Sequence, residues 1–259
     1  MRQCAVRILL PPSETKSEGA TASELCLERL FAPELTPFRR AIAEQLVKFC
    51  ARPTARVRSA IGTTINQDAD LARNAALFSA PTSPAHDVYT GVLFDALDLP
   101  SLPVAARKRA REHVLVQSAL FGVAAFGDAI PAYRLSADSS LPRIGKVGSH
   151  WKPRIAQTMD RLADNALIID MRSGAYASFW KTPPDHVVVR VMQERGGKKI
   201  AVSHFNKATK GLLARSLLAP ATQPTNAGQV ASLLDGAGFD VDVVAQRNAA
   251  DLLIVTIDQ

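Results

Sequence analysis

The sequence has few cysteines and none of the short motifs that mark the common enzyme classes. Its cysteines, Cys4, Cys26 and Cys50, lie far apart, so they form no zinc-binding pair and do not suit a secreted disulfide framework. There is no phosphate-binding loop ending in Gly-Lys-Ser/Thr, no dinucleotide-binding Gly-x-Gly-x-x-Gly and no Gly-x-Ser-x-Gly nucleophile elbow. These absences disfavour P-loop enzymes, dinucleotide-dependent oxidoreductases and serine hydrolases, and we expect no cofactor.

Histidine is also sparse, and no pair of histidines has metal-binding spacing. No two of them stand four residues apart, and none lies beside a group of cysteines; they are His86, His113, His150, His186 and His204. We therefore expect no metal site.

Long apolar runs are missing as well. Ile8–Leu10 ends at Pro11-Pro12 and is far too short to span a membrane. Charged residues interrupt the first seven positions, where a signal peptide needs an apolar stretch. We therefore expect a cytoplasmic protein that does not interact with membranes.

The overall composition is that of a folded globular protein, with a surplus of positive charge. Of 259 residues, 47% are hydrophobic and 21% are charged, enough apolar surface for a core. The formal net charge of +7 favours phosphate polymers or nucleotides as partners, although a basic surface also serves solubility alone.

Strand-like and helix-like patterns alternate along the whole chain. Short apolar runs predict strands at 6–10, 114–119, 166–170, 187–192, 200–205, 240–244 and 252–257. Helical periodicity covers 35–49, 55–61, 68–78, 103–112, 207–218 and 226–237. Without repeats, this mixture predicts an α/β fold with a mixed sheet, α+β-like in character. We expect one domain over 1–259, with a possible helical sub-lobe at about 21–78.

Polar residues follow the first predicted strand directly. In open α/β sheets, loops at strand ends bind ligands, and the segment 11–16 (Pro-Pro-Ser-Glu-Thr-Lys) is such a loop. Lys16 could hold a phosphate or, in a dry site, act as a nucleophilic amine. The alternative is a solvated loop lysine.

Two further segments carry side chains suited to a ligand site. Tyr89-Thr90-Gly91 allows close approach of a ligand, although Tyr89 could equally be a core tyrosine. Tyr133 and Arg134 are adjacent, so on a strand they would face opposite ways and only one could enter a given cleft.

The strongest concentration of positive charge lies between Arg195 and Arg215. This window contains no acidic residue; its cations are Arg195, Lys198, Lys199, Lys207, Lys210 and Arg215. On a helix with about 100° per residue, Lys207, Lys210, Gly211 and Arg215 fall within about 140° of one another. Such a stripe could contact a phosphate backbone that approaches at Gly211, or it could be a solvated face.

Five segments, in this order and spacing, resemble the YaaA family of bacterial peroxide-stress proteins. They are Pro11–Lys16, Asp87–Gly91, Ser118–Val123, Pro131–Leu135 and Ser203–Arg215. The resemblance implies a compact fold peculiar to the family, a positively charged cleft, DNA binding during oxidative stress, and a response that lowers free iron.

The family likeness also suggests residues for the cleft. It implies that Lys16, Tyr89, Thr90, Tyr133, Arg134, Lys207, Lys210 and Arg215 lie in or beside it. The family's helix-hairpin-helix element would fall at 53–78, around Gly62, although the usual paired glycine is missing. Trp151 matches an aromatic position of the family and could stack on a base or anchor the following helix in the core.

Two functions remain open from the sequence. The first is a DNA-binding stress protein in which Lys16, Thr90, Arg134, Lys207, Lys210 and Arg215 contact phosphates. The second is an enzyme acting on a nucleotide, nucleobase or DNA lesion, with Lys16, Tyr89, Tyr133 and Arg134 as catalytic residues. In both cases the expected partner is DNA or a nucleotide.

Overall fold

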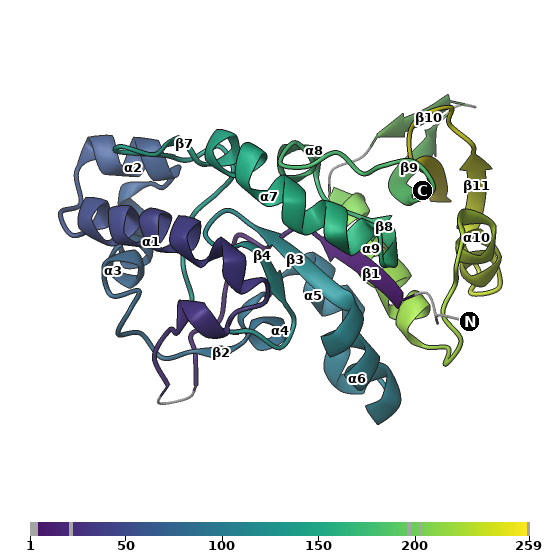
Figure 1. The fold of residues 1–259 in the computed structure, drawn as a ribbon, viewed down its shortest axis with the longest axis horizontal. Coiled ribbons are helices and arrows are strands. Elements are labelled where there is room, and N and C mark those ends of the chain that lie inside the picture. The colour runs from purple at the N-terminus through teal and green to yellow at the C-terminus, as the bar shows by residue number, and fades with distance from the viewer. Residues whose placement is uncertain (1–4, 21–22, 196–197, 202–203, 258–259) are drawn as a thin grey trace.

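A computed structural model gives the fold of residues 5–20, 23–195, 198–201 and 204–257 (Figure 1). Its main sheet has the strand order β11-β12-β9-β8-β1-β3-β4, with β10 paired to the outer part of β9. The strands of this sheet are β1 (Ala5–Leu10), β3 (Val114–Ser118), β4 (Gly122–Ala125), β8 (Ala166–Asp170), β9 (Val187–Arg195), β10 (Lys198–Ala201), β11 (Asp240–Val244) and β12 (Asp251–Ile257). Short two-residue strands pair outside it: β2 (Ser83–Pro84) with β5 (Ala129–Ile130), and β6 (Ser140–Leu141) with β7 (Gly145–Lys146).

Helices connect these strands. They are α1 (Thr36–Cys50), α2 (Ala55–Ile61), α3 (Asp68–Ala75), α4 (Ala85–Val88), α5 (Val92–Leu97), α6 (Val104–His113), α7 (Val147–Ala163), α8 (Gly174–Ala177), α9 (His204–Leu218) and α10 (Ala227–Asp235). Single 3₁₀ turns lie at Leu27–Arg29, Pro33–Leu35, Ile65–Gln67 and Leu99–Ser101. Within the described ranges, no helix is long and apolar enough to cross a membrane.

The centre of the sheet is parallel and covered on both faces. β1 lies between β3 and β8, with Ile8 opposite both Val114 and Ile169. Every residue of β8 is buried, which fits its unbroken apolar run. α7 packs against β8 and crosses the near side of the sheet in Figure 1, whereas α6 packs against β1 and β3.

The parallel register brings three strand ends to one edge of the sheet. β1 ends at Leu10 and is followed by Pro11-Pro12, which cannot extend the ladder. β3 ends at Ser118, and β8 ends at Asp170. The loops that carry polar side chains therefore start from neighbouring strands, as expected for a ligand-binding edge.

Helices α1, α2 and α3 gather at one end of the molecule, at the left of Figure 1. Gly62 ends α2 with a left-handed φ of 76°, and a capping box of Thr64 and Gln67 starts the turn that leads into α3. Arg39 of α1 is fully buried and donates hydrogen bonds to the carbonyls of Phe121 and Val123 at 2.8 and 2.9 Å. These bonds fix the helical end to the edge strand β4.

The predicted mixed-sheet α/β fold is confirmed, and most predicted elements are found within a few residues. The strand predicted at 200–205 is too long, because β10 ends at Ala201 and α9 already begins at His204. The helical pattern did not reveal α7, which contains Pro153 and so loses a backbone donor inside the helix. β4 and α5, each of six residues or fewer, were also not predicted.

Candidate functional site

Residues from four separate segments meet at the carboxyl end of β1. They form what we call the Lys16 cluster, which consists of Lys16, Tyr89, Ser118, Tyr133 and Arg134. Lys16 comes from the loop after β1, Tyr89 from the end of α4, and Ser118 from the end of β3. The sequence predicted four of these five residues and missed Ser118.

The loop that carries Lys16 is held by backbone pairing to the segment after α4. Lys16 and Tyr89 form an isolated antiparallel bridge, and the Ser17 amide donates to the Val88 carbonyl at 2.9 Å. The Thr90 amide donates to the Ser13 hydroxyl at 3.2 Å. Lys16 is therefore part of an ordered, half-buried arrangement, which excludes the solvated-loop alternative.

The Lys16 amine has little polar compensation for its burial. Its Nζ donates to the Ser13 carbonyl at 2.7 Å and lies 4.3 Å from the ring centre of Tyr133 and 5.4 Å from that of Tyr89. Burial, followed by the charge of Arg134, lowers the pKa of Lys16 to about 7, against opposing contributions from Asp70 and Glu14. A large fraction of the amine is thus neutral at physiological pH, as a nucleophilic lysine requires.

The tyrosine hydroxyls form a buried chain that ends at the turn after β3. The Ser118 hydroxyl oxygen accepts hydrogen bonds from the amides of Leu120 and Phe121, so its hydrogen is free to donate to Tyr133 at 2.7 Å. The Tyr133 hydroxyl lies 3.0 Å from that of Tyr89. Burial raises the pKa of both phenols, so they stay neutral and hold the rings that flank Lys16.

Tyr133 and Arg134 both act on Lys16, the first through its ring and the second through its charge, although neighbours on a strand would face opposite ways. Residues 131–136 are not a strand, so the expected alternation does not apply. The buried Asn74 of α3 fixes the segment, because its amide donates to the Arg134 carbonyl at 2.8 Å and its oxygen accepts from the Arg134 amide at 2.9 Å. The guanidinium reaches Glu14 at 3.4 Å.

A second charged group, the Asp170 cluster of Asp170, Arg172, Gln117, Thr182 and Lys210, lies at the end of β8. Arg172 forms two hydrogen bonds to the Asp170 carboxylate, Nε to Oδ1 at 2.9 Å and Nη2 to Oδ2 at 2.7 Å, and both side chains are buried. Gln117 and Thr182 complete the network at 3.1 and 2.7 Å. Burial alone would raise the pKa of Asp170, but the Arg172 contacts lower it overall. The Asp170–Arg172 pair and its neighbours therefore form a hydrogen-bonded network that serves the structure.

The predicted stripe on α9 does not present one charged face. Lys207 is exposed, but Lys210 is 7% exposed and donates to the Arg172 carbonyl at 3.2 Å. Burial lowers the pKa of Lys210 to about 8. Arg215 donates to the carbonyls of Leu97 and Asp98 at 3.0 and 2.9 Å, at the end of α5.

Gly211 serves helix packing and offers no approach to a phosphate. A Cβ at this position would lie 2.2 Å from the Leu93 carbonyl of α5. The glycine lets α9 and α5 come into close contact, which leaves no room for a ligand there. The side chains of Arg195, Lys198 and Lys199, which complete the predicted basic window, lie outside the described residues.

Trp151 is a core residue. Its side chain is fully buried, and its indole Nε1 donates to the Ala119 carbonyl at 2.7 Å. The ring fills the space beside Gly122, where a Cβ would come within 2.8 Å of it. Of the two alternatives for Trp151, anchoring of the helix is therefore correct.

Among the described side chains, no group of three or more His, Cys, Asp or Glu residues is arranged to hold a metal ion. The Lys16 cluster consists of lysine, arginine, tyrosine and serine side chains, which bind anions and transfer protons and do not typically ligate hard cations.

Comparison with known proteins assigns the family. The sequence profile described as peroxide stress protein YaaA matches residues 6–242, nearly the whole chain. The chain belongs to the YaaA family. The first four of the five resembling segments supply the Lys16 cluster and the loops around it, and the fifth forms most of α9.

Several relatives from bacteria align with the chain over almost their full length. The chain is 39% identical to UPF0246 protein SCO2297 of Streptomyces coelicolor over 241 residues, 92% of each chain. It is 41% identical to UPF0246 protein CE1889 of Corynebacterium efficiens, over 96% of this chain and 99% of the relative. A Corynebacterium glutamicum relative, UPF0246 protein Cgl1995/cg2186, is 37% identical over 91% and 94%.

Proposed function

We propose that this YaaA family member binds nucleic acid at the Lys16 cluster during peroxide stress. The observation that supports this is the meeting of Lys16, Tyr133 and Arg134 at the carboxyl edge of β1, where ligands of open α/β sheets bind. Lysine and arginine side chains contact phosphates in complexes with nucleic acid, and the buried Tyr133 ring supports Lys16 from below. Within the family's role, such binding would help to limit iron-dependent damage to DNA.

The helix pair α2–α3 supports the same location. Asp70 of α3 acts electrostatically on Lys16, and Asn74 of the same helix holds the backbone of Arg134. The pair therefore borders the cluster, where it could serve as the family's helix-hairpin-helix element with Gly62 in the turn. Lys207 lies on the exposed part of α9 and remains available for a phosphate.

Fluorescence anisotropy with labelled single-stranded and duplex DNA tests the proposal. Affinity should fall steeply with salt: log Kd should rise by about 0.9 per unit of log salt concentration for each phosphate contacted in duplex DNA. Lys16→Ala and Arg134→Ala should weaken binding, whereas Arg111→Ala, a matched loss of charge on the exposed face of α6, should change it little. A flat salt response, or equal effects of all three variants, would disprove the proposal.

A second candidate function is favoured by one specific observation, the position of the Lys16 amine against the rings of Tyr89 and Tyr133. A lysine with a pKa of about 7, seated against two tyrosine rings, can attack an aldehyde such as that of an opened abasic sugar. The amine nitrogen bonds to the carbonyl carbon, the resulting carbinolamine loses water, and an imine links the protein to DNA. This function requires nucleic-acid binding at the same cluster and adds a covalent step.

Trapping with borohydride separates the two functions. Reduction of the imine leaves a stable secondary amine between protein and abasic DNA, seen as a shifted band on a denaturing gel. The adduct should form with the parent chain and with Lys207→Ala, and it should be lost in Lys16→Ala and Lys16→Arg. If DNA binds at the cluster but no adduct forms, the protein is a binding protein only.

A further inference from the structure

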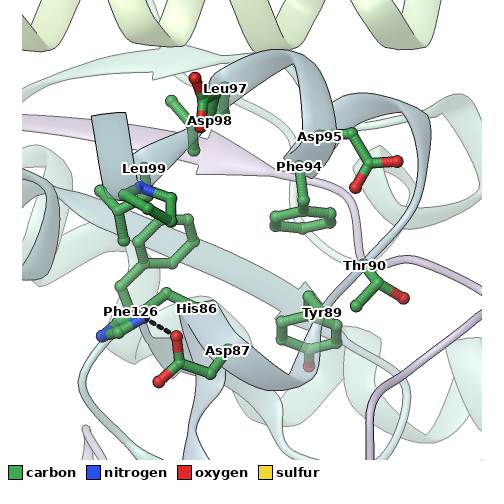
Figure 2. A pocket seen from close by; sticks show the side chains of 11 residues that line it. His86, Asp87, Tyr89, Thr90, Phe94, Asp95, Leu97, Asp98, Leu99 and Phe126 are labelled. Carbon is green, nitrogen blue, oxygen red and sulfur yellow. Dashed lines mark hydrogen bonds and ion pairs between the residues drawn. The ribbon is translucent and has the colours of Figure 1, made fainter. Parts of the chain in front are cut away.

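A pocket lies beside Tyr89, and Lys16 is not among its lining residues. Figure 2 shows it between α4, α5 and the turn after β4, with a volume of about 290 Å³. Its walls include the aromatic residues Tyr89, Phe94 and Phe126 and the acidic residues Asp87, Asp95 and Asp98. This volume suits a small molecule and is too small for a macromolecular segment of any length.

The aromatic residues form a continuous row beneath the pocket. The rings of Tyr89 and Phe94 are stacked, with centroids 5.5 Å apart and planes at 19°, and Phe94 lies 6.3 Å from Phe126. All three are buried, so their positions are fixed by packing. Phe94 keeps the most exposure of the three, 9%, so it is the ring that a bound organic cation can contact, on a base made rigid by the other two.

The carboxylates carry more negative charge than their neighbours neutralise. Asp98 has Arg215 at 3.8 Å, and Asp87 has the Nδ1 of His86 at 2.9 Å. Asp95 forms no ion pair with any residue that the structure describes, and it is exposed at the rim (Figure 2). Phosphate would be repelled here, which separates this pocket from the neighbouring Lys16 cluster.

His86 gives an independent sign of a missing partner. It lines the pocket with a side chain that is only 8% exposed. Its Nε2 is buried and, within the described part of the chain, has no hydrogen-bond partner. Buried polar atoms are usually hydrogen-bonded, so an unpaired one beside a pocket points to a ligand or bound water.

We propose that this pocket binds a small organic cation, an ammonium or amidinium group on an apolar or aromatic body. The apolar part packs on Phe94, and the cationic group is held by Asp95 at the rim, while Asp87 and Asp98 add negative charge to the pocket. A bare metal ion is disfavoured because no three acidic or histidine side chains in the described ranges are arranged to ligate one. The inference goes beyond the proposed function and does not depend on it.

A matched set of probes tests the charge requirement. Benzamidinium, neutral benzamide and anionic benzoate have nearly the same shape, and binding is followed by isothermal titration and by ligand-observed NMR. Benzamidinium should bind saturably and at least about ten-fold more tightly than benzamide, with benzoate not binding. Equal binding of benzamidinium and benzamide, or no saturable binding of benzamidinium, would overturn the proposal.

Variants locate the binding in the pocket. Asp95→Asn should weaken benzamidinium about three- to five-fold, as expected for a partly exposed charge pair. Asp98→Asn should also weaken benzamidinium binding. Asparagine is chosen because it tolerates the left-handed φ of 45° at this position. Asp240→Asn, on the distant exposed strand β11, should have no effect. An Asp240→Asn effect equal to that of Asp95→Asn would place the binding elsewhere and refute the pocket.

Parallel measurements keep this test separate from that of the proposed function. Lys16→Ala should leave benzamidinium affinity unchanged, and Asp95→Asn should leave DNA affinity within about two-fold, because one exposed charge has a small effect. If benzamidinium binds but DNA does not, only the nucleic-acid proposal fails. If DNA binds but benzamidinium does not, only the pocket proposal fails.

Discussion

The Lys16 cluster and the Asp170 cluster lie at the same edge of the sheet, yet their charged groups have opposite surroundings. Lys210 lies beside the carboxylate of Asp170, which opposes the effect of burial on its pKa. The charge of Arg134 adds to the effect of burial on the pKa of Lys16, and Asp70 and Glu14 each oppose it by a smaller amount. Fully paired charges stabilise the fold, whereas a lysine that faces a cation becomes available for chemistry.

The largest effect should come from breaking the Asp170 cluster. Asp170→Ala leaves the guanidinium of Arg172 buried without its partner, which typically costs about 3–5 kcal/mol of unfolding free energy. Urea unfolding followed by circular dichroism measures the loss. The double variant Asp170→Leu/Arg172→Met should recover part of it, because no buried charge then remains. A loss below about 1 kcal/mol in the single variant would contradict the structural role.

A smaller effect is expected in the Lys16 cluster when one hydroxyl is removed. Tyr133→Phe keeps the ring beneath Lys16 but removes the link between Ser118 and Tyr89, at a cost of about 1–2 kcal/mol. Tyr89→Phe removes only one of these hydrogen bonds and should cost less. The same urea assay compares the two, and a larger loss for Tyr89→Phe would show that the chain does not run through Tyr133.

The pH dependence of stability should distinguish Lys16 from an ordinary lysine. Its pKa falls from 10.5 in the unfolded chain to about 7 in the folded one, so between these values the unfolded state binds more protons and stability rises with pH. Below about pH 7 both states are protonated and the burial penalty is complete. Lys16→Met should therefore be more stable than the parent at about pH 6. The difference in unfolding free energy between the two should be smaller at about pH 9.

Lys207→Met is the matched control for that measurement, since Lys207 is exposed and should give the same difference at both pH values. If the difference in unfolding free energy between Lys16→Met and the parent does not change with pH, the amine keeps an ordinary pKa.

The smallest effect on stability is expected on α9. Lys207→Ala should change the unfolding free energy by less than about 0.5 kcal/mol, because the side chain is exposed. If Lys207 contacts a phosphate, the same variant should lower the salt slope of DNA binding by about 1. Lys210→Ala should instead lower stability, since it removes a buried donor to the Arg172 carbonyl. Equal losses of stability at the two positions would contradict the conclusion that Lys207 is exposed and Lys210 is buried.

Many elements of the fold could be predicted because their patterns are local. The unbroken apolar run 166–170 is a fully buried parallel strand, and Leu213 and Leu217 point to the core, as the helical period of α9 requires. The limits of β10 and α9 were misplaced because the apolar run around Ala201 fits a strand or a helix equally well. Pro153 obscured α7, whose stability comes from packing against β8.

The structure brings some of the candidate residues together and separates others, because their positions depend on contacts between distant segments. Lys16 follows β1 at the sheet edge and Tyr89 pairs with it, whereas Tyr133 and Arg134 lie in an irregular segment that Asn74 of α3 holds. Lys210 and Arg215 were grouped with Lys207 by helical angle alone, and angle does not show which side faces Arg172 or α5. Ser118 gave no signal of its own beyond its place at the start of a family segment.

The amino-acid sequence by itself determined the alternation of strands and helices, the family and the loop that carries Lys16, since these depend on local pattern and on motif order. Only the tertiary structure decided which charges are paired. Asp170 and Arg172 are near in sequence, but Gln117 and Lys210 reach them through the fold, and Arg134 reaches Lys16 in the same way. A pKa depends on burial and on neighbours from distant segments, so the chemistry of Lys16 is a property of the folded chain.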